Sequence, residues 1–90
     1  MSVQTLRAPV LIQEENFDPA VSVFAPKSEI QNISHIAMAA GAISVSISMD
    51  SIGGDGNPLK EVFCLFQEDT DFDRFYRRLS KARYTVIIPA

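Results

Sequence analysis

The fold is decided by residues 43–50, which read ISVSISMD. Apolar side chains at the odd positions alternate with serine or aspartate at the even positions. Successive residues of a β-strand point to opposite faces of the sheet, so this period of two predicts a strand. One face of the strand is expected in the core, and the other is expected to carry the hydroxyl groups of Ser44, Ser46 and Ser48.

Three further strands are predicted around this one. Residues 60–67, KEVFCLFQ, are apolar on both faces, which suits a central strand. They follow a turn at residues 53–58, GGDGNP, so the two strands should form a hairpin. Shorter apolar runs at residues 21–25 and 84–88 complete the set of four.

Two helices are predicted between these strands. Ser28 has the features of an N-cap, with Gln31 as its capping-box partner, and Gly41 supplies the C-terminal stop. The second helix begins at Thr70 and carries Asp71 and Asp73 in its first turn, where the helix dipole favours carboxylates. Each helix has an apolar stripe at helical spacing: Ile30, Ile33, Ala37 and Ala40 in the first, and Phe72, Phe75, Tyr76 and Leu79 in the second.

The resulting order, strand, helix, strand, strand, helix, strand, predicts an α+β fold of the ferredoxin-like class. That class has a four-stranded antiparallel sheet with both helices on one face. We assign residues 20–90 to this domain. Residues 1–19 are predicted to be an N-terminal arm or an extra edge strand, because Pro9 cannot donate a hydrogen bond inside a sheet.

Composition excludes several classes of function. The 90 residues carry a net charge of −3, which opposes nucleic-acid or membrane binding. A single cysteine and a single histidine cannot form an intrachain disulfide or a Cys/His zinc site, and we predict no metal and no cofactor. With 47% hydrophobic residues and no long apolar segment, the chain is expected to be a soluble, cytoplasmic globule.

Two groups of residues are candidates for binding. Small hydroxyl side chains at Ser44, Ser46 and Ser48 would let another surface approach the sheet, whether the N-terminal arm, a second subunit or a partner protein. A basic stripe on the second helix could form a binding surface or be a solvated helix face: Arg74, Arg77, Arg78 and Lys81. The acidic cluster at residues 68–73 is explained by its position at a helix start.

Residues 20–88 resemble the ACT family of small regulatory domains. The resemblance is carried by PKSEI at residues 26–30, by AAGAISVSISM at residues 39–49, and by residues 69–82 followed by YTVI. It implies a dimer that binds an amino acid at the turn between the first strand and first helix. The family's Asp and Gly at that turn are replaced here by residues 24–28, FAPKS, and we take Lys27, Ser28 and Glu29 as the groups facing an anionic ligand.

The sequence therefore predicts a small non-enzymatic interaction or regulatory module that self-associates or docks on a larger protein. The alternative is a sensor of small ligands in the ACT manner. A third hypothesis is a small enzyme that uses His35, although no neighbouring nucleophile identifies a catalytic site.

Overall fold

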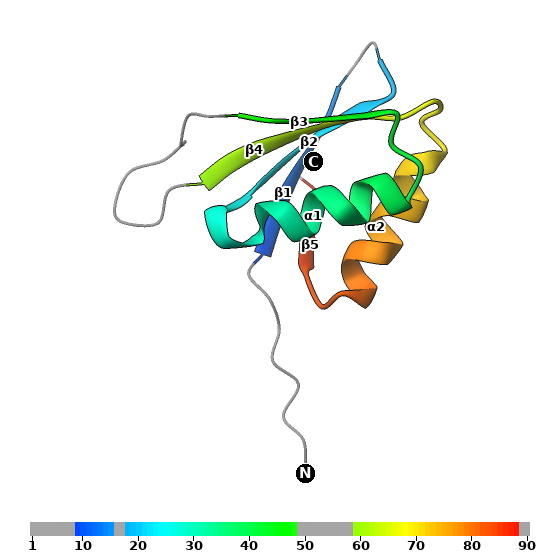
Figure 1. The fold of residues 1–90 in the computed structure, drawn as a ribbon. Helices are drawn as coiled ribbons and strands as arrows, with labels where there is room; N and C mark the ends of the chain where they lie inside the picture. The colour runs from blue at the N-terminus through cyan, green and yellow to red at the C-terminus, as the bar shows by residue number, and fades with distance from the viewer. Residues whose placement is uncertain (1–8, 16–17, 49–58, 89–90) are drawn as a thin grey trace.

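The computed structural model describes residues 9–15, 18–48 and 59–88, and the turn predicted at residues 53–58 lies outside them. The elements are β1 (Pro9–Glu14), β2 (Ala20–Pro26), α1 (Lys27–Ala39), β3 (Ser44–Ile47), β4 (Leu59–Leu65), α2 (Asp71–Lys81) and β5 (Thr85–Ile87). The described residues form a small α+β fold with two helices and one sheet (Figure 1). Neither helix is long and apolar enough to cross a membrane.

The sheet has five strands rather than four, in the order β3-β4-β2-β1-β5. The pairs β3–β4, β4–β2 and β2–β1 are antiparallel, whereas β1 and β5 run parallel. The predicted sequence of six elements from β2 to β5 is present, and the predicted pairing of β3 with β4 is confirmed. The extra strand changes the sheet from antiparallel to mixed.

The expectation that an extra N-terminal strand would lie at an edge is wrong. β1 lies between β2 and β5, where Ile12 is opposite Val23 and Val10 is opposite Val86. Val10 and Ile12 are fully buried on the helix side, so β1 supplies core and does not cover the other face. Pro9 is tolerated because it is the first residue of the strand, where a missing N–H disturbs the ladder least.

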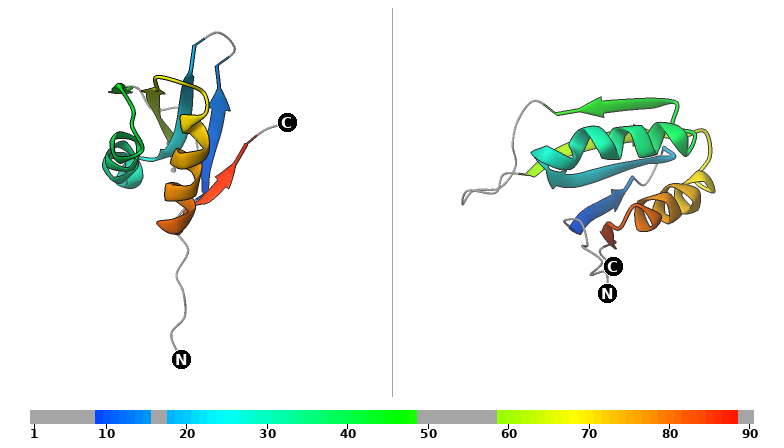
Figure 2. Two further views of the ribbon diagram at one scale, coloured as in Figure 1. Left: turned by 90° about the vertical axis from the view of Figure 1, so that its right-hand side faces the viewer. Right: turned by 60° about the horizontal axis from the view of Figure 1, so that its bottom comes forward.

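Both helices lie on one side of the sheet (Figure 2). Their apolar stripes pack on alternate residues of the three central strands, and these strand residues are fully buried: Val10, Ile12, Val21, Val23, Val62 and Cys64. An aromatic group anchors α2, with the ring centroid of Phe66 5.7 Å from that of Phe72 and 5.5 Å from that of Phe75. The core is therefore a single layer between the helices and one face of the sheet.

The predicted core face of β3 is only partly in the core. Val45 is half-buried, but Ile47 is 46% exposed and Ile43, just before the strand, is 61% exposed. The reason is the position of β3 at the edge of the sheet, where a neighbouring strand flanks it on one side only.

Both helices end in the same motif. After α1, the amide of Gly41 donates to Met38 and that of Ala42 donates to Ala37; after α2, the amide of Arg83 donates to Ser80 and that of Tyr84 donates to Leu79. These 5→2 and 6→1 bonds define a Schellman motif, which needs a residue with positive φ. Gly41 supplies it with φ 103°, as predicted, while Arg83 supplies it with φ 75°.

The N-terminus of α1 differs from the prediction. The N-cap is Pro26, and no side chain caps the helix, so Ser28 lies inside the first turn. Its hydroxyl is therefore not the capping group that the sequence pattern indicated. The predicted start of α2 is confirmed, since Thr70 is the N-cap residue, although its side chain bonds Glu68 and not the helix.

The two left-handed positions give opposite predictions for stability. Gly41→Ala should lower the free energy of unfolding by about 1 kcal/mol, because an L-residue pays a steric cost at positive φ. A Cβ at Gly41 would meet only Arg74 Nη1, at 3.6 Å, so this cost is conformational. Arg83→Gly should raise the free energy of unfolding by up to about 1 kcal/mol, because glycine adopts positive φ without steric cost. The greater conformational entropy of glycine in the unfolded chain reduces this gain.

Urea unfolding of the two variants and the wild type measures both effects. Equal changes of the same sign would contradict the interpretation of both helix ends.

Candidate functional site

The side of the sheet that faces away from the helices is its open face. Alternate strand residues point there, since their neighbours are buried on the helix side. The apolar members of the open face are Leu11, Ala20, Phe24, Pro26, Leu59, Phe63, Leu65 and Ile87. Ala20 is fully buried, but no described element covers the others, and Leu11 and Ile87 are 38% and 45% exposed.

The three serines predicted to line a covered surface lie at the β3 edge of this open face. Ser44 is opposite Leu65 and Ser46 is opposite Phe63, while the amide of Ser48 donates to the Glu61 carbonyl at 2.9 Å. Ser44 and Ser46 are exposed within the described structure. Their small side chains leave the half-buried Phe63 and Leu65 open to approach from that edge.

One polar pair lies within the open face. The Ser22 hydroxyl donates to Glu61 Oε2 at 2.7 Å, and Ser22 is only 2% exposed. A hydrogen bond to an ionised acceptor is among the stronger kinds, and it gives the carboxylate a partner inside an apolar surface. The open face therefore combines apolar side chains with a polar pair that is already satisfied.

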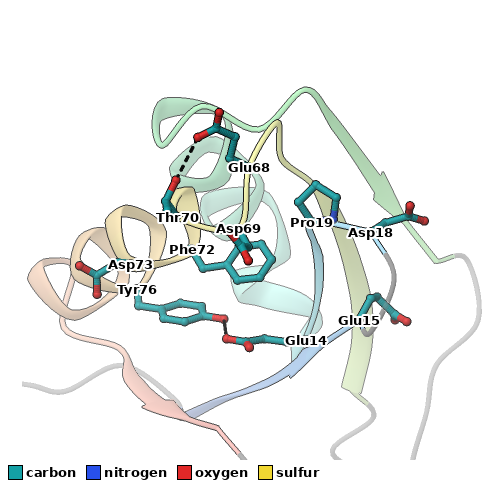
Figure 3. A pocket seen from close by; sticks show the side chains of 10 residues that line it. All are labelled: Glu14, Glu15, Asp18, Pro19, Glu68, Asp69, Thr70, Phe72, Asp73 and Tyr76. Atoms are coloured by element: carbon teal, nitrogen blue, oxygen red, sulfur yellow. Dashed lines mark hydrogen bonds between the residues drawn. The ribbon is translucent and has the colours of Figure 1, made fainter.

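A second surface is an open cleft of about 710 Å³ beside the N-terminal end of α2 (Figure 3). We call it the acidic cleft. Its lining comes from the β1–β2 connection and from the start of α2: Glu14, Glu15, Asp18, Pro19, Glu68, Asp69, Thr70, Phe72, Asp73 and Tyr76. The lining holds six carboxylates and no cationic side chain. A negative potential therefore accumulates in this cleft.

Sequence reasoning missed the acidic cleft because its two halves are distant along the chain. The Phe66 amide donates to the Pro19 carbonyl at 2.7 Å, and this bond brings the start of β2 beside the segment that leads into α2. The carboxylates of Glu14, Glu15 and Asp18 thereby join those at the helix start. Residues 14–19, EENFDP, are mostly polar, but nothing in the sequence shows which segment they lie beside.

Tyr76 spans the floor of the acidic cleft and ties α2 to β1. Its hydroxyl donates to Glu14 Oε2 at 2.6 Å. Burial raises the pKa of Tyr76 above its ordinary value, and the hydrogen bond to Glu14 and the charge of that carboxylate raise it further. The phenol therefore stays protonated and keeps its role as a donor.

The predicted basic stripe lies along the next strip of α2, in a groove of about 440 Å³ lined by Thr70, Asp73, Arg74, Arg77, Arg78 and Lys81. We call it the basic groove. Arg77 Nη2 lies 2.9 Å from Asp73 Oδ2, and Arg74 Nη1 lies 3.9 Å from Asp71 Oδ1. Both arginine side chains are mostly exposed, so these pairs contribute little to stability.

The other predicted residues are separate from these surfaces. Lys27 and Ser28 are exposed in the first turn of α1 beside the half-buried Glu29, and their proposed contact with an anionic ligand stays a prediction. His35 is exposed in a shallow hollow between the helices, beside Arg78 and Lys81. Across the described ranges, no group of three or more His, Cys, Asp or Glu side chains is arranged to hold a metal ion.

Cys64 is the remaining reactive side chain, and it is fully buried in β4. Burial raises the pKa of the Cys64 thiol from 9.0 to about 12, which removes the thiolate at neutral pH. The thiol is therefore part of the core.

The native protein should resist iodoacetamide at pH 8 and react fully once unfolded in urea. Because the folded pKa is raised, the stability linked to this thiol is complete below pH 9.0 and is lost as the pH rises toward about 12. A Cys64→Ala variant should show a weaker alkaline loss of stability. Rapid alkylation of the native chain would contradict this placement.

Comparisons with protein-family models, with curated proteins and with solved structures find no match to this chain.

Proposed function

We propose that this chain is a non-enzymatic interaction module of the ferredoxin-like class that self-associates through the open face of its sheet. The observation that carries the proposal is the apolar surface formed by Phe24, Phe63 and Leu65 and continued by Leu11 and Ile87, which no described element covers. Contiguous exposed apolar surface of this kind marks interaction sites in folded proteins. Docking on a larger protein is the other outcome that the same surface allows.

The size of the open face supports a protein partner. Five strands at a spacing of about 4.8 Å give a width of roughly 24 Å, and strands of three to seven residues give a length of roughly 10–23 Å. Two copies packed face to face would cover roughly 500–1,100 Å² in total, and the upper end of this range reaches the area of about 1,000 Å² expected of a specific interface.

The composition of the open face suits a second copy in particular. Phe24 and Phe63 lie on neighbouring central strands, so each copy offers aromatic anchors near the middle of the surface. Ser44 and Ser46, on the neighbouring edge strand, have short side chains, so a second sheet can approach closely there. An isologous dimer needs one self-complementary patch, and this face has large and small side chains next to each other.

Introducing a charge into this surface should dissociate the complex. Phe63→Lys and, separately, Ser46→Lys should weaken self-association at least tenfold, because each places an ammonium group in an interface that would exclude water. Gln31→Lys adds the same charge at an exposed position on α1 and should leave the mass unchanged. Light scattering coupled to size-exclusion chromatography measures the masses, and circular dichroism checks folding.

A monomeric wild type at micromolar concentration would overturn the proposed self-association. Wild-type masses for both folded lysine variants would also reject the open face as the interface.

A further inference from the structure

The acidic cleft and the basic groove adjoin on one surface of the molecule. Both are lined by Thr70 and Asp73, so the boundary between the two charges runs along α2. One side holds six carboxylates, and the other holds four cationic side chains. The carboxylates of Glu68, Asp69 and Asp73 lie at the start of α2, where the helix dipole favours them, whereas those of Glu14, Glu15 and Asp18 come from the end of β1 and the β1–β2 connection and are placed there by the fold.

This arrangement is self-complementary. A two-fold axis that lies along this boundary generates a second copy whose α2 surface faces that of the first. The positions of the acidic cleft and the basic groove are exchanged in the second copy. The basic groove of each copy then faces the acidic cleft of the other, and the contact is made twice. An axis in any other direction within this surface would bring like charges together in part.

The side chains on both sides suit this contact. Arg77 is 77% exposed and Arg74 is 62% exposed at the side chain, so both guanidinium groups can reach a second copy while they remain beside their carboxylate partners on α2. The acidic cleft is wide enough to admit such groups, and Tyr76 gives it an aromatic wall, against which guanidinium groups stack. The six carboxylates are spread along the cleft, so several separate cationic groups could contact them.

We propose that a second copy of this chain docks on the α2 surface, with the basic groove of each copy against the acidic cleft of the other. This contact does not depend on the proposed function, because α2 and the open face lie on opposite sides of the sheet. A chain that uses both surfaces forms assemblies larger than a dimer. The α2 contact is electrostatic and weakens in salt, whereas the contact of the open face is apolar and persists.

Charge reversal tests the contact on each side. The basic variant is Arg78→Glu with Lys81→Glu, and the acidic variant is Glu15→Lys with Asp69→Lys. All four side chains are exposed. Each variant alone brings like charges together in both halves of the contact, so self-association through α2 should weaken at least tenfold. An equimolar mixture leaves one half of the contact unaltered and sets the introduced carboxylates against the introduced ammonium groups in the other half, so the two variants should assemble with each other.

The experiment is done on the full chain carrying Ser46→Lys, which should weaken any contact of the open face at least tenfold while leaving α2 unchanged. Sedimentation velocity is measured at about 0.01 M and about 1 M NaCl, where the Debye length falls from about 30 Å to about 3 Å. We expect association of the parent chain at low salt, its loss at high salt, and heteromeric assembly only in the mixture.

Three results would overturn the proposal: a parent chain that is monomeric at low salt, a charge-reversed variant that associates alone as the parent does, or a mixture that stays monomeric. A failure of Ser46→Lys to affect the wild-type mass would instead count against the open face, and the two proposals therefore fail separately.

Discussion

Two helices can cover only one face of a five-stranded sheet, and this limit governs the rest of the molecule. α1 and α2 bury alternate residues of the central strands, including Val23 and Cys64, to form one apolar layer. The chain offers no third layer within the described residues, so the opposite residues of the same strands remain at the surface. Phe24 and Phe63 are among them, and their partial exposure follows from the number of elements available.

The two sides of the molecule therefore differ in the kind of contact they can make. The open face is apolar and contains a polar pair, Ser22 with Glu61, that is already hydrogen-bonded. The α2 side is charged, with opposite signs on either side of Asp73. Apolar surfaces gain binding free energy from the exclusion of water. Charged surfaces instead orient the two partners as they meet and raise the association rate. A single small domain thus presents two surfaces of different chemistry.

Local patterns in the sequence were sufficient for the element order and for the helix stripes, since Phe72, Phe75 and Leu79 are all buried. They failed where the outcome depends on distant residues. The strand order that places β1 beside β5 has no local signal, and neither does the Pro19–Phe66 bond that assembles the acidic cleft. Arg83 was missed for another reason: it occupies a left-handed position that sequence rules reserve for glycine.

The parallel pairing of β1 with β5 joins segments from opposite ends of the described sequence, with Val10 opposite Val86. During synthesis β1 is the first of the described strands to emerge, and its partner β5 is the last of them. Hairpins and helices in between can form from neighbouring residues, whereas this pair must close the longest loop of the fold. Until it does, one flank of β1 offers unpaired amides and carbonyls to any extended peptide nearby, so nascent chains are most prone to aggregate at this strand.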